Sequence, residues 1–240
     1  HTGAMRLLGD AFVSGEGVVK NKTEAVYWYR KAADKGDSIA QCSVGDMYYH
    51  YGEDEAEQNI AVALHWYQKA AEQGILDAQD NLGTIFRDGY GVNQDFAEAA
   101  CWFLKAAEQG DYQAQHNLGQ LFRAGAGVTQ DNAKAILWFR KAAEQEYDQA
   151  QFDLGDMLST SEGSINDLAE AAVWFRNAAE QGHAEAQYSL GAAHDNGDGV
   201  KKDDAEAVRW YRLAAEQGNA NAQNSLGDMY CGGHGVKQKD

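Results

Sequence analysis

Hydrophobic and polar positions follow one another along the chain in two alternating kinds of block. The first kind reads Ala-Gln, two variable positions, Leu-Gly, one variable position, and then a hydrophobic and an aromatic residue, as in residues 114–122. The second kind reads Ala, two variable positions, Trp, an aromatic residue and, shortly after, an Ala-Ala pair, as in residues 135–143. In both, apolar side chains recur every three or four residues, the spacing of one face of an α-helix. The pattern predicts an all-α chain of helix pairs.

These blocks recur at a fixed period. Tryptophan marks the second block at intervals of 38, 36, 36, 36 and 36 residues: Trp28, Trp66, Trp102, Trp138, Trp174 and Trp210. A glycine series lies in step with it: Gly9, Gly45, Gly83, Gly119, Gly155, Gly191 and Gly227. Such a period is typical of solenoids, in which each repeat buries its hydrophobic face against its neighbours. We expect one array over residues 1–240, a piece of a longer one, with repeats at 1–36, 37–74, 75–110, 111–146, 147–182 and 183–218 and a partial repeat at 219–240.

The ends of the second helices carry their own signals. Asn or Asp stands at one fixed position, as expected of N-caps that accept hydrogen bonds from the first turn: Asn21, Asn59, Asp95, Asp131, Asp167 and Asp203. Glutamate follows three residues later in four repeats, which predicts reciprocal capping boxes. Glycine ends these helices at Gly36, Gly74, Gly110, Gly182 and Gly218. Glu146 takes that place once, so we expect a differently built corner there.

Glycine in the middle of every first helix needs a reason, because it costs about 0.5–1 kcal/mol relative to alanine. We expect a neighbouring helix to approach closely there, with the Ala-Ala pairs of the second helices as its contact surface. The tryptophans, beside those alanines, are expected in the core. A Gly-x-Gly-Val loop joins the two helices in most repeats, as at residues 89–92, and the stretches 52–59 and 159–166 depart from it.

The motifs AQxxLGxxY, GxGV and DxxxAxxW[YF]xKAAEQG, taken together, resemble the Sel-1-like repeat branch of the tetratricopeptide superfamily over essentially the whole chain. The resemblance implies a right-handed α/α superhelix of antiparallel helix pairs, with first helices lining a concave face. It also implies a bacterial scaffold or adaptor that binds a protein or peptide. Family members are typical of the periplasm or envelope, or are secreted or delivered to a host, while the free thiols fit the cytoplasm equally well.

Composition narrows the class of partner. The chain has no proline, a formal net charge of −17 and a pI near 4.7. An acidic surface does not suit nucleic acid, whose phosphates require basic side chains, and no apolar run is long enough for direct membrane insertion. A ladder of glutamates at the ends of the second helices makes a basic partner possible, although a solvated face is the preferred interpretation: Glu72, Glu108, Glu144, Glu180 and Glu216.

The sequence offers little catalytic chemistry. The seven histidines are scattered over different repeat positions, and no His/Cys spacing typical of zinc ligands and no nucleophile motif is present. We expect no catalytic residue, no cofactor and no metal, and hence a protein that is not an enzyme. Cys42, Cys101 and Cys231 occupy three different repeat positions, so we expect free, mostly packed thiols. The alternatives are a structural spacer in a larger protein, or a ligand-binding protein or hydrolase related to cysteine-rich β-lactam-binding family members.

A partner would bind where packing does not dictate residue identity. If Ala40 and Val44 face the interior of their helix pair, then Cys42, Asp46 and Tyr49 lie on another face of that helix. The equivalent positions vary along the array, which indicates either plain surface or a specificity-determining groove. Aromatic and arginine side chains are typical of binding hot spots. The candidate groove residues are Arg87, His116, Gln120, Arg123, Phe152, Asp156, Tyr188 and Asp195.

Overall fold

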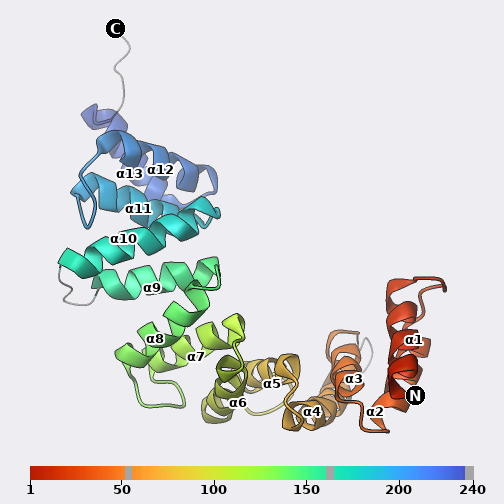
Figure 1. Ribbon diagram of the computed structural model, residues 1–240. Helices are drawn as coiled ribbons and strands as arrows, with labels where there is room; N and C mark the ends of the chain where they lie inside the picture. The colour runs from red at the N-terminus through yellow and green to blue at the C-terminus, as the bar shows by residue number, and fades with distance from the viewer. Residues whose placement is uncertain (52–55, 161–164, 236–240) are drawn as a thin grey trace. The chain divides into compact units, whose positions relative to one another are not determined.

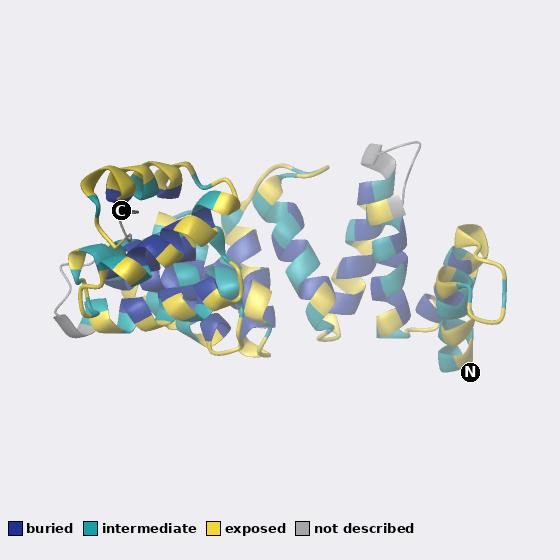
Figure 2. Cartoon of the chain, turned by 90° about the horizontal axis from the view of Figure 1, so that it is seen from above, coloured by how far each residue is buried: buried dark blue, intermediate teal, exposed yellow. Residues whose placement is uncertain are grey.

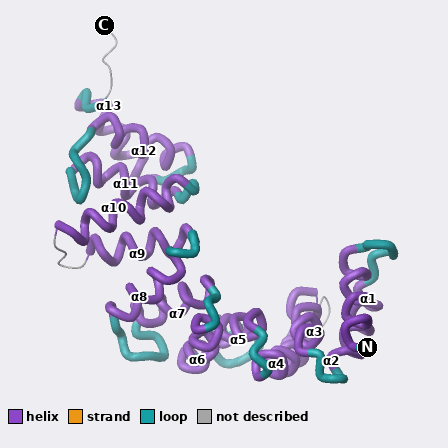
Figure 3. The backbone as a smooth tube through the Cα atoms, in the orientation of Figure 1, coloured by secondary structure: helices purple, strands orange, loops and turns teal. Residues whose placement is uncertain are grey.

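The computed structural model describes residues 1–51, 56–160 and 165–235, which form two compact units, residues 1–130 and 131–240. Every regular element in the described ranges is an α-helix, as the tube in Figure 3 shows. The predicted all-α class is therefore confirmed. The two irregular linkers expected near 52–59 and 159–166 fall partly on residues 52–55 and 161–164, which lie outside the described residues.

Each unit is a succession of helices that pack in chain order (Figure 1). The first unit holds α1 (Thr2–Ser14), α2 (Lys22–Ala33), α3 (Ser38–Tyr51), α4 (Ala56–Glu72), α5 (Leu76–Asp88), α6 (Phe96–Glu108) and α7 (Tyr112–Ala124). The second holds α8 (Asn132–Ala143), α9 (Asp148–Thr160), α10 (Ile165–Glu180), α11 (Ala184–Asn196), α12 (Asp204–Glu216) and α13 (Ala220–Gly232). Buried residues run as stripes along the helices in Figure 2, as the three-and-four spacing predicts.

Four of the six predicted N-caps are confirmed. Asn21, Asp95, Asp131 and Asp203 each accept a hydrogen bond from a first-turn amide. Asn59 and Asp167 do not cap, because α4 and α10 begin earlier and contain them. Their repeats lack the Gly-x-Gly-Val loop. Where that loop is present, both glycines adopt positive φ, for example 68° and 71° at Gly89 and Gly91 in the linker that ends at Asp95, so the helix start depends on the loop as much as on the cap residue.

The glutamate three residues after the cap does not complete a capping box. The backbone N–H of Asp95 donates instead to the carbonyl of Phe86 on the preceding helix, at 2.8 Å. Glu98 accepts from Nε1 of Trp102 at 2.9 Å. The predicted core position of this tryptophan is confirmed, since it is only 8% exposed. Thus the glutamate orients the indole, and the amide of the cap residue joins the two helices of a pair.

In five of the first helices, the glycine in the middle makes room for an aromatic ring. A Cβ at Gly83 would lie 2.5 Å from Cδ1 and Cε1 of Phe103, the residue that follows Trp102. The same relation holds for the pairs Gly9–Tyr29, Gly45–Tyr67, Gly155–Phe175 and Gly191–Tyr211. The expected close approach is confirmed, but the assignment of the Ala-Ala pairs as its partner was wrong.

The Ala-Gln motif has a structural role that its spacing alone does not reveal. Nε2 of Gln79 donates to the carbonyl of Ala71 on the preceding helix at 3.1 Å, while its Oε1 accepts from Nε2 of Gln109 on the following second helix at 2.7 Å. Gln79 is 4% exposed. The same bonds recur in the triplets Ala33–Gln41–Gln73, Ala143–Gln151–Gln181 and Ala179–Gln187–Gln217. We call this repeated set the glutamine relay.

The corner at Glu146 is built like the glycine corners, contrary to the sequence prediction. Glu146 adopts φ 65°, and it is the one non-glycine residue with positive φ in the described ranges. Its amide bonds the carbonyl of Ala143 at 3.0 Å, and that of Tyr147 bonds Ala142 at 3.4 Å. Gly110 makes the equivalent bond to Ala107 at 3.1 Å. The repeat geometry therefore overrides the preference of a residue with a Cβ.

Replacing Glu146 with glycine should stabilise the protein. A left-handed backbone costs a residue with a Cβ about 1–2 kcal/mol, part of which is offset by the greater freedom of glycine in the unfolded chain. Glu146→Gly should therefore raise the free energy of unfolding by about 1 kcal/mol, measured by urea denaturation followed by circular dichroism. Glu144→Gly is the control, because Glu144 is exposed at φ −65° and should lose stability. Equal effects at both positions would contradict the prediction.

Candidate functional site

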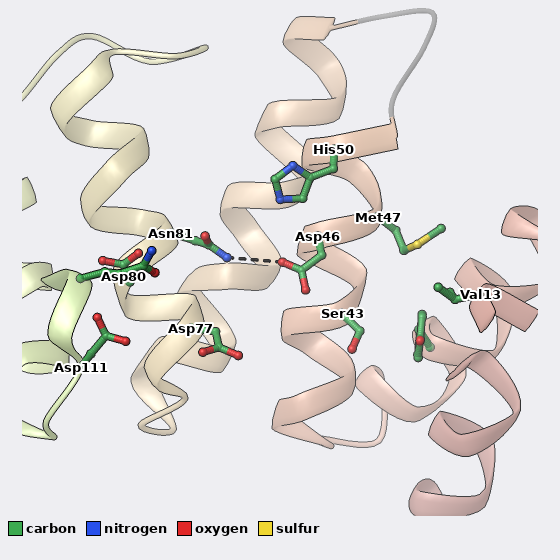
Figure 4. Close-up of a pocket in the computed structure, with 11 residues that line it drawn as sticks. Val13, Ser43, Asp46, Met47, His50, Asp77, Asp80, Asn81 and Asp111 are labelled. Carbon is green, nitrogen blue, oxygen red and sulfur yellow. Dashed lines mark hydrogen bonds between the residues drawn. The ribbon is translucent and has the colours of Figure 1, made fainter. Parts of the chain in front are cut away.

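The first unit contains a cavity of about 480 Å³ lined chiefly by its first helices (Figure 4). Helices α3, α5 and the start of α7 supply most of the wall, and α1 and α2 supply two residues at one end. The lining residues are Val13, Tyr29, Ser43, Asp46, Met47, His50, Asp77, Asp80, Asn81, Asp111 and Gln113. We call it the acidic concavity.

Four carboxylates face this space, and neither lysine nor arginine is among its lining residues. Asp46 lies in the middle of α3, Asp77 and Asp80 in the first turns of α5, and Asp111 caps α7 by accepting from the amide of Ala114. A concave surface lined by charges of one sign concentrates the field and attracts ions of the opposite sign. The acidic concavity therefore favours cationic groups.

Asp46 is held in place by its neighbours. Its Oδ1 accepts a hydrogen bond from the hydroxyl of Tyr67 at 2.9 Å. It accepts another from Nδ2 of Asn81 at 3.3 Å, which Figure 4 shows. Tyr67 is fully buried, so the core itself positions the carboxylate. Burial raises the pKa of Asp46 above its usual value, and the hydrogen bond from Tyr67 lowers it in part.

Asp80 has a strongly perturbed pKa. Burial, and then the negative charge of Asp111, raise its pKa to about 6. Its Oδ1 is buried and has no hydrogen-bond partner within the described residues. The positive charge of Arg87 and a hydrogen bond with Asn117 lower the pKa in part. The guanidinium of Arg87 is shared with Asp88, at 2.7 and 3.1 Å, and with Asn117, at 2.9 Å. A cationic donor in the acidic concavity would satisfy this carboxylate.

The groove residues predicted in this unit contact neighbouring side chains and do not line the acidic concavity. Besides its contacts to Asp88 and Asn117, Arg87 lies over the ring of Phe103 at 5.9 Å. His116 is 9% exposed, with Nε2 at 3.4 Å from Nε2 of Gln120. Arg123 is half-buried near the end of α7. The structure thus brings His116 and Gln120 together, and the acidic concavity is lined by a different set.

Placing the predicted stripe on an open face of α3 was also inaccurate. Cys42 is 5% exposed and packs in a core cluster with Tyr67 and Leu82, and Tyr49 packs against the same cluster. Asp46 is the member of the stripe that reaches the acidic concavity. The expectation of mostly packed thiols holds for Cys42 alone, since Cys101 and Cys231 are free and exposed.

The Sel1 repeat family model matches the chain at residues 2–37, 38–75, 76–111, 113–147, 148–183, 184–219 and 220–240. The chain belongs to the Sel1 repeat family. The seven matched segments follow the period read from the tryptophans, and the predicted family and helix-pair solenoid are confirmed.

Two solved structures share more than 30% identity with this Sel1 repeat protein. One is a Sel1 repeat protein from Oxalobacter formigenes, 34% identical over 95% of this chain and 65% of that one, with a TM-score of 0.77. The other is a protective antigen of uropathogenic Escherichia coli with an SLR fold, 33% identical over 95% of this chain and 56% of that one, with a TM-score of 0.66. The chain therefore spans less than two thirds of either relative. No curated protein matches it.

In the second unit, the Sel1 repeat packing engages the predicted aromatic anchors. The ring of Phe152 stacks on His183 at 4.8 Å and lies 6.0 Å from Phe175, and Tyr188 lies 5.7 Å from Tyr211. Both predicted anchors are half-buried, Phe152 against its own and the next repeat and Tyr188 against its own repeat. Asp195 lies 3.9 Å from Nζ of Lys202.

Two of the predicted residues in this unit share a site. Asp156 and Tyr188 both line a cavity of about 230 Å³ between α9, α10 and α11. The sequence prediction placed them on the same stripe of variable positions, and in the structure both line the same cavity.

Sequence reasoning missed most of the acidic concavity, because it considered each first helix by itself and did not consider the charges at the starts of neighbouring first helices together. Asp77 and Asp111 lie at the starts of successive first helices, and stacking those starts would have placed their charges together. Within the described residues, no group of three or more His, Cys, Asp or Glu side chains is arranged to hold a metal ion. No helix in this part of the chain is long and apolar enough to cross a membrane.

Proposed function

We propose that this Sel1 repeat protein is a non-enzymatic interaction scaffold whose first unit binds a cationic segment of a partner polypeptide in the acidic concavity. The observation that carries the proposal is Asp80, an acid kept half-buried among other acids at a cost in stability. Strongly perturbed ionisable groups in a cavity are more frequent at functional sites than elsewhere. A lysine or arginine side chain would supply a hydrogen bond to Oδ1 of Asp80 and a further positive charge beside it.

The shape of the site supports a polypeptide over a compact ligand. Its four carboxylates come from α3, α5 and the start of α7, which are successive first helices, so an occupant that touches all of them must be elongated. Solenoids bind extended partners on such surfaces. The relative from uropathogenic Escherichia coli is a protective antigen, which is compatible with a surface that meets other macromolecules.

The test compares binding of a fluorescent lysine-rich peptide by fluorescence anisotropy. The double variant Asp77→Asn with Asp80→Asn should weaken binding at least about tenfold at low salt, because two charges leave the acidic concavity. The control is Glu72→Gln with Glu108→Gln, which removes the same net charge from exposed glutamates outside the site. A peptide with glutamine in place of lysine should not bind. If both double variants weaken binding equally, attraction is only general and the proposed site is wrong.

The pH dependence gives a second readout of the same experiment. Because the pKa of Asp80 is about 6, its charge is present at about pH 7.5 and is lost on acidification through pH 6. Peptide affinity should therefore fall from about pH 7.5 to 5.5, whereas stability should rise, since the folded protein holds this proton where the unfolded chain has released it. Asp80→Asn should flatten both trends. An affinity independent of pH in the unaltered protein would contradict the role of Asp80.

A further inference from the structure

The sixth repeat departs from the repeat pattern in the middle of its first helix. Ala193 in α11 occupies the position that carries a large aliphatic side chain in five other repeats: Met47, Ile85, Leu121, Met157 and Met229. The preceding position, Ala192, is also small. These five side chains are all buried, and Ile85 and Leu121, for example, are 0% and 4% exposed. A space is therefore expected beside Ala193.

The cavity of about 230 Å³ in the second unit lies at this point. Leu168, Ala172 and Phe175 of α10 contribute apolar wall, opposite Ala193 of α11. Phe175 is itself only 6% exposed, so its ring is fixed by the core. The missing methyl and methylene groups of one large side chain thus enlarge an apolar recess that opens to the surface.

Polar groups surround this recess. Asp156 and Ser159 of α9, Tyr188 of α11 and Asp198 in the following loop line the same cavity, and neither lysine nor arginine is among its lining residues. The nearby cations have partners elsewhere. Lys202 lies 3.9 Å from Asp195 and 3.8 Å from Asp204, and Arg176 lies 3.5 Å from Nε2 of His194. An apolar recess bounded by two carboxylates fits an alkyl chain that ends in a positive charge.

We propose that this recess binds the side chain of a single lysine or arginine of a bound polypeptide. The alkyl stem packs between Phe175 and Ala193, and the cationic head group lies near Asp156 and Asp198 with the ring of Tyr188 beside it. That the side chain belongs to a polypeptide rests on the proposed function. The recess itself lies within the second unit and is tested by its own variants.

The experiment titrates ¹⁵N-labelled protein with Nα-acetyl-lysine methylamide and follows the amide shifts of Tyr188, Ala192 and Ala193. Its neutral counterpart, Nα-acetyl-norleucine methylamide, should bind at least about fivefold more weakly, because it keeps the stem and lacks the charge. Asp156→Asn with Asp198→Asn should remove this preference while leaving the weak binding of the norleucine compound. Equal affinity of the two compounds would overturn the assignment to a cation.

Ala193→Met is the decisive variant, because it introduces the methionine that three other repeats carry at this position and fills the recess without a change in charge. It should abolish the shifts with both compounds, with helicity unchanged and thermal stability maintained or raised. Binding of the lysine compound that survives Ala193→Met would overturn the proposed site. Asp77→Asn with Asp80→Asn alters only the first unit. The experiments therefore distinguish a failure of peptide binding in the acidic concavity from a failure of lysine binding in the recess of the second unit.

Discussion

Gln79→Ala is expected to lower the free energy of unfolding by about 2–4 kcal/mol. Gln79 is the central member of one glutamine relay, bonded to the carbonyl of Ala71 and to Nε2 of Gln109. Truncation removes two buried hydrogen bonds, each of which contributes about 0.5–1.5 kcal/mol. The Ala71 carbonyl keeps its bond from the amide of Gly74 at 3.0 Å, and Nε2 of Gln109 keeps its bond to the carbonyl of Lys105 at 3.3 Å. The loss of side-chain volume at a position only 4% exposed adds to this cost.

Urea denaturation followed by circular dichroism measures this effect, and the array supplies a matched control. Gln223 occupies the same repeat position in α13 and donates to the carbonyl of Ala215 at 3.2 Å, but it is exposed. Water replaces the lost donor there, so Gln223→Ala should cost under about 1 kcal/mol. If the two substitutions cost the same, burial of the relay does not account for the Ala-Gln motif.

Gly83→Ala should also destabilise the protein, by about 2 kcal/mol, although alanine is the better helix former. The new Cβ would lie 2.5 Å from the ring of Phe103, whose side chain is fully buried and has no free space to enter. Overpacking of this kind costs about 1–3 kcal/mol and occasionally more, which exceeds the gain of about 0.5–1 kcal/mol in helix propensity.

Gly227→Ala tests the same substitution where the ring is absent. Gly227 holds the equivalent position in α13, and no atom lies within 4 Å of a Cβ built there. Helix propensity alone then determines the effect of the substitution on stability. Thermal and urea denaturation should show that the free energy of unfolding rises by about 0.5–1 kcal/mol. Opposite signs at Gly83 and Gly227 are the expected result. A stabilising Gly83→Ala would show that the ring does not require the glycine.

The repeat architecture was predictable because each element carries several signals that agree. Period, apolar spacing and corner glycines all indicate the same helix pairs, and four caps lie where expected. The failures occurred where a residue was judged without its loop or partner. Asn59 and Asp167 look like caps but lack the loop that starts a helix there, and Glu146 adopts the backbone of the glycine that it replaces.

The candidate site was less accessible to sequence reasoning, because it depends on which side of a helix meets its neighbour. Phe152 varies among repeats as a binding residue would, yet its ring stacks on His183 of the next repeat. Asp77 and Asp80 come together with Asp46 only when successive first helices are stacked. A position that varies among repeats is one where the repeat fold does not require a particular side chain. The side chain present there can still be packed against its own neighbours.

The glutamine relay bears on how arrays of this family change length. Each relay spans only three helices that are adjacent in the chain, and each repeat that carries the central glutamine also carries the glutamine that donates to it. A tandem duplication or an in-frame loss of one whole repeat would therefore recreate the same bonds at the new junction. Genomes can lengthen or shorten such a protein by single units, while recombination breakpoints inside a unit would separate a glutamine from its partners.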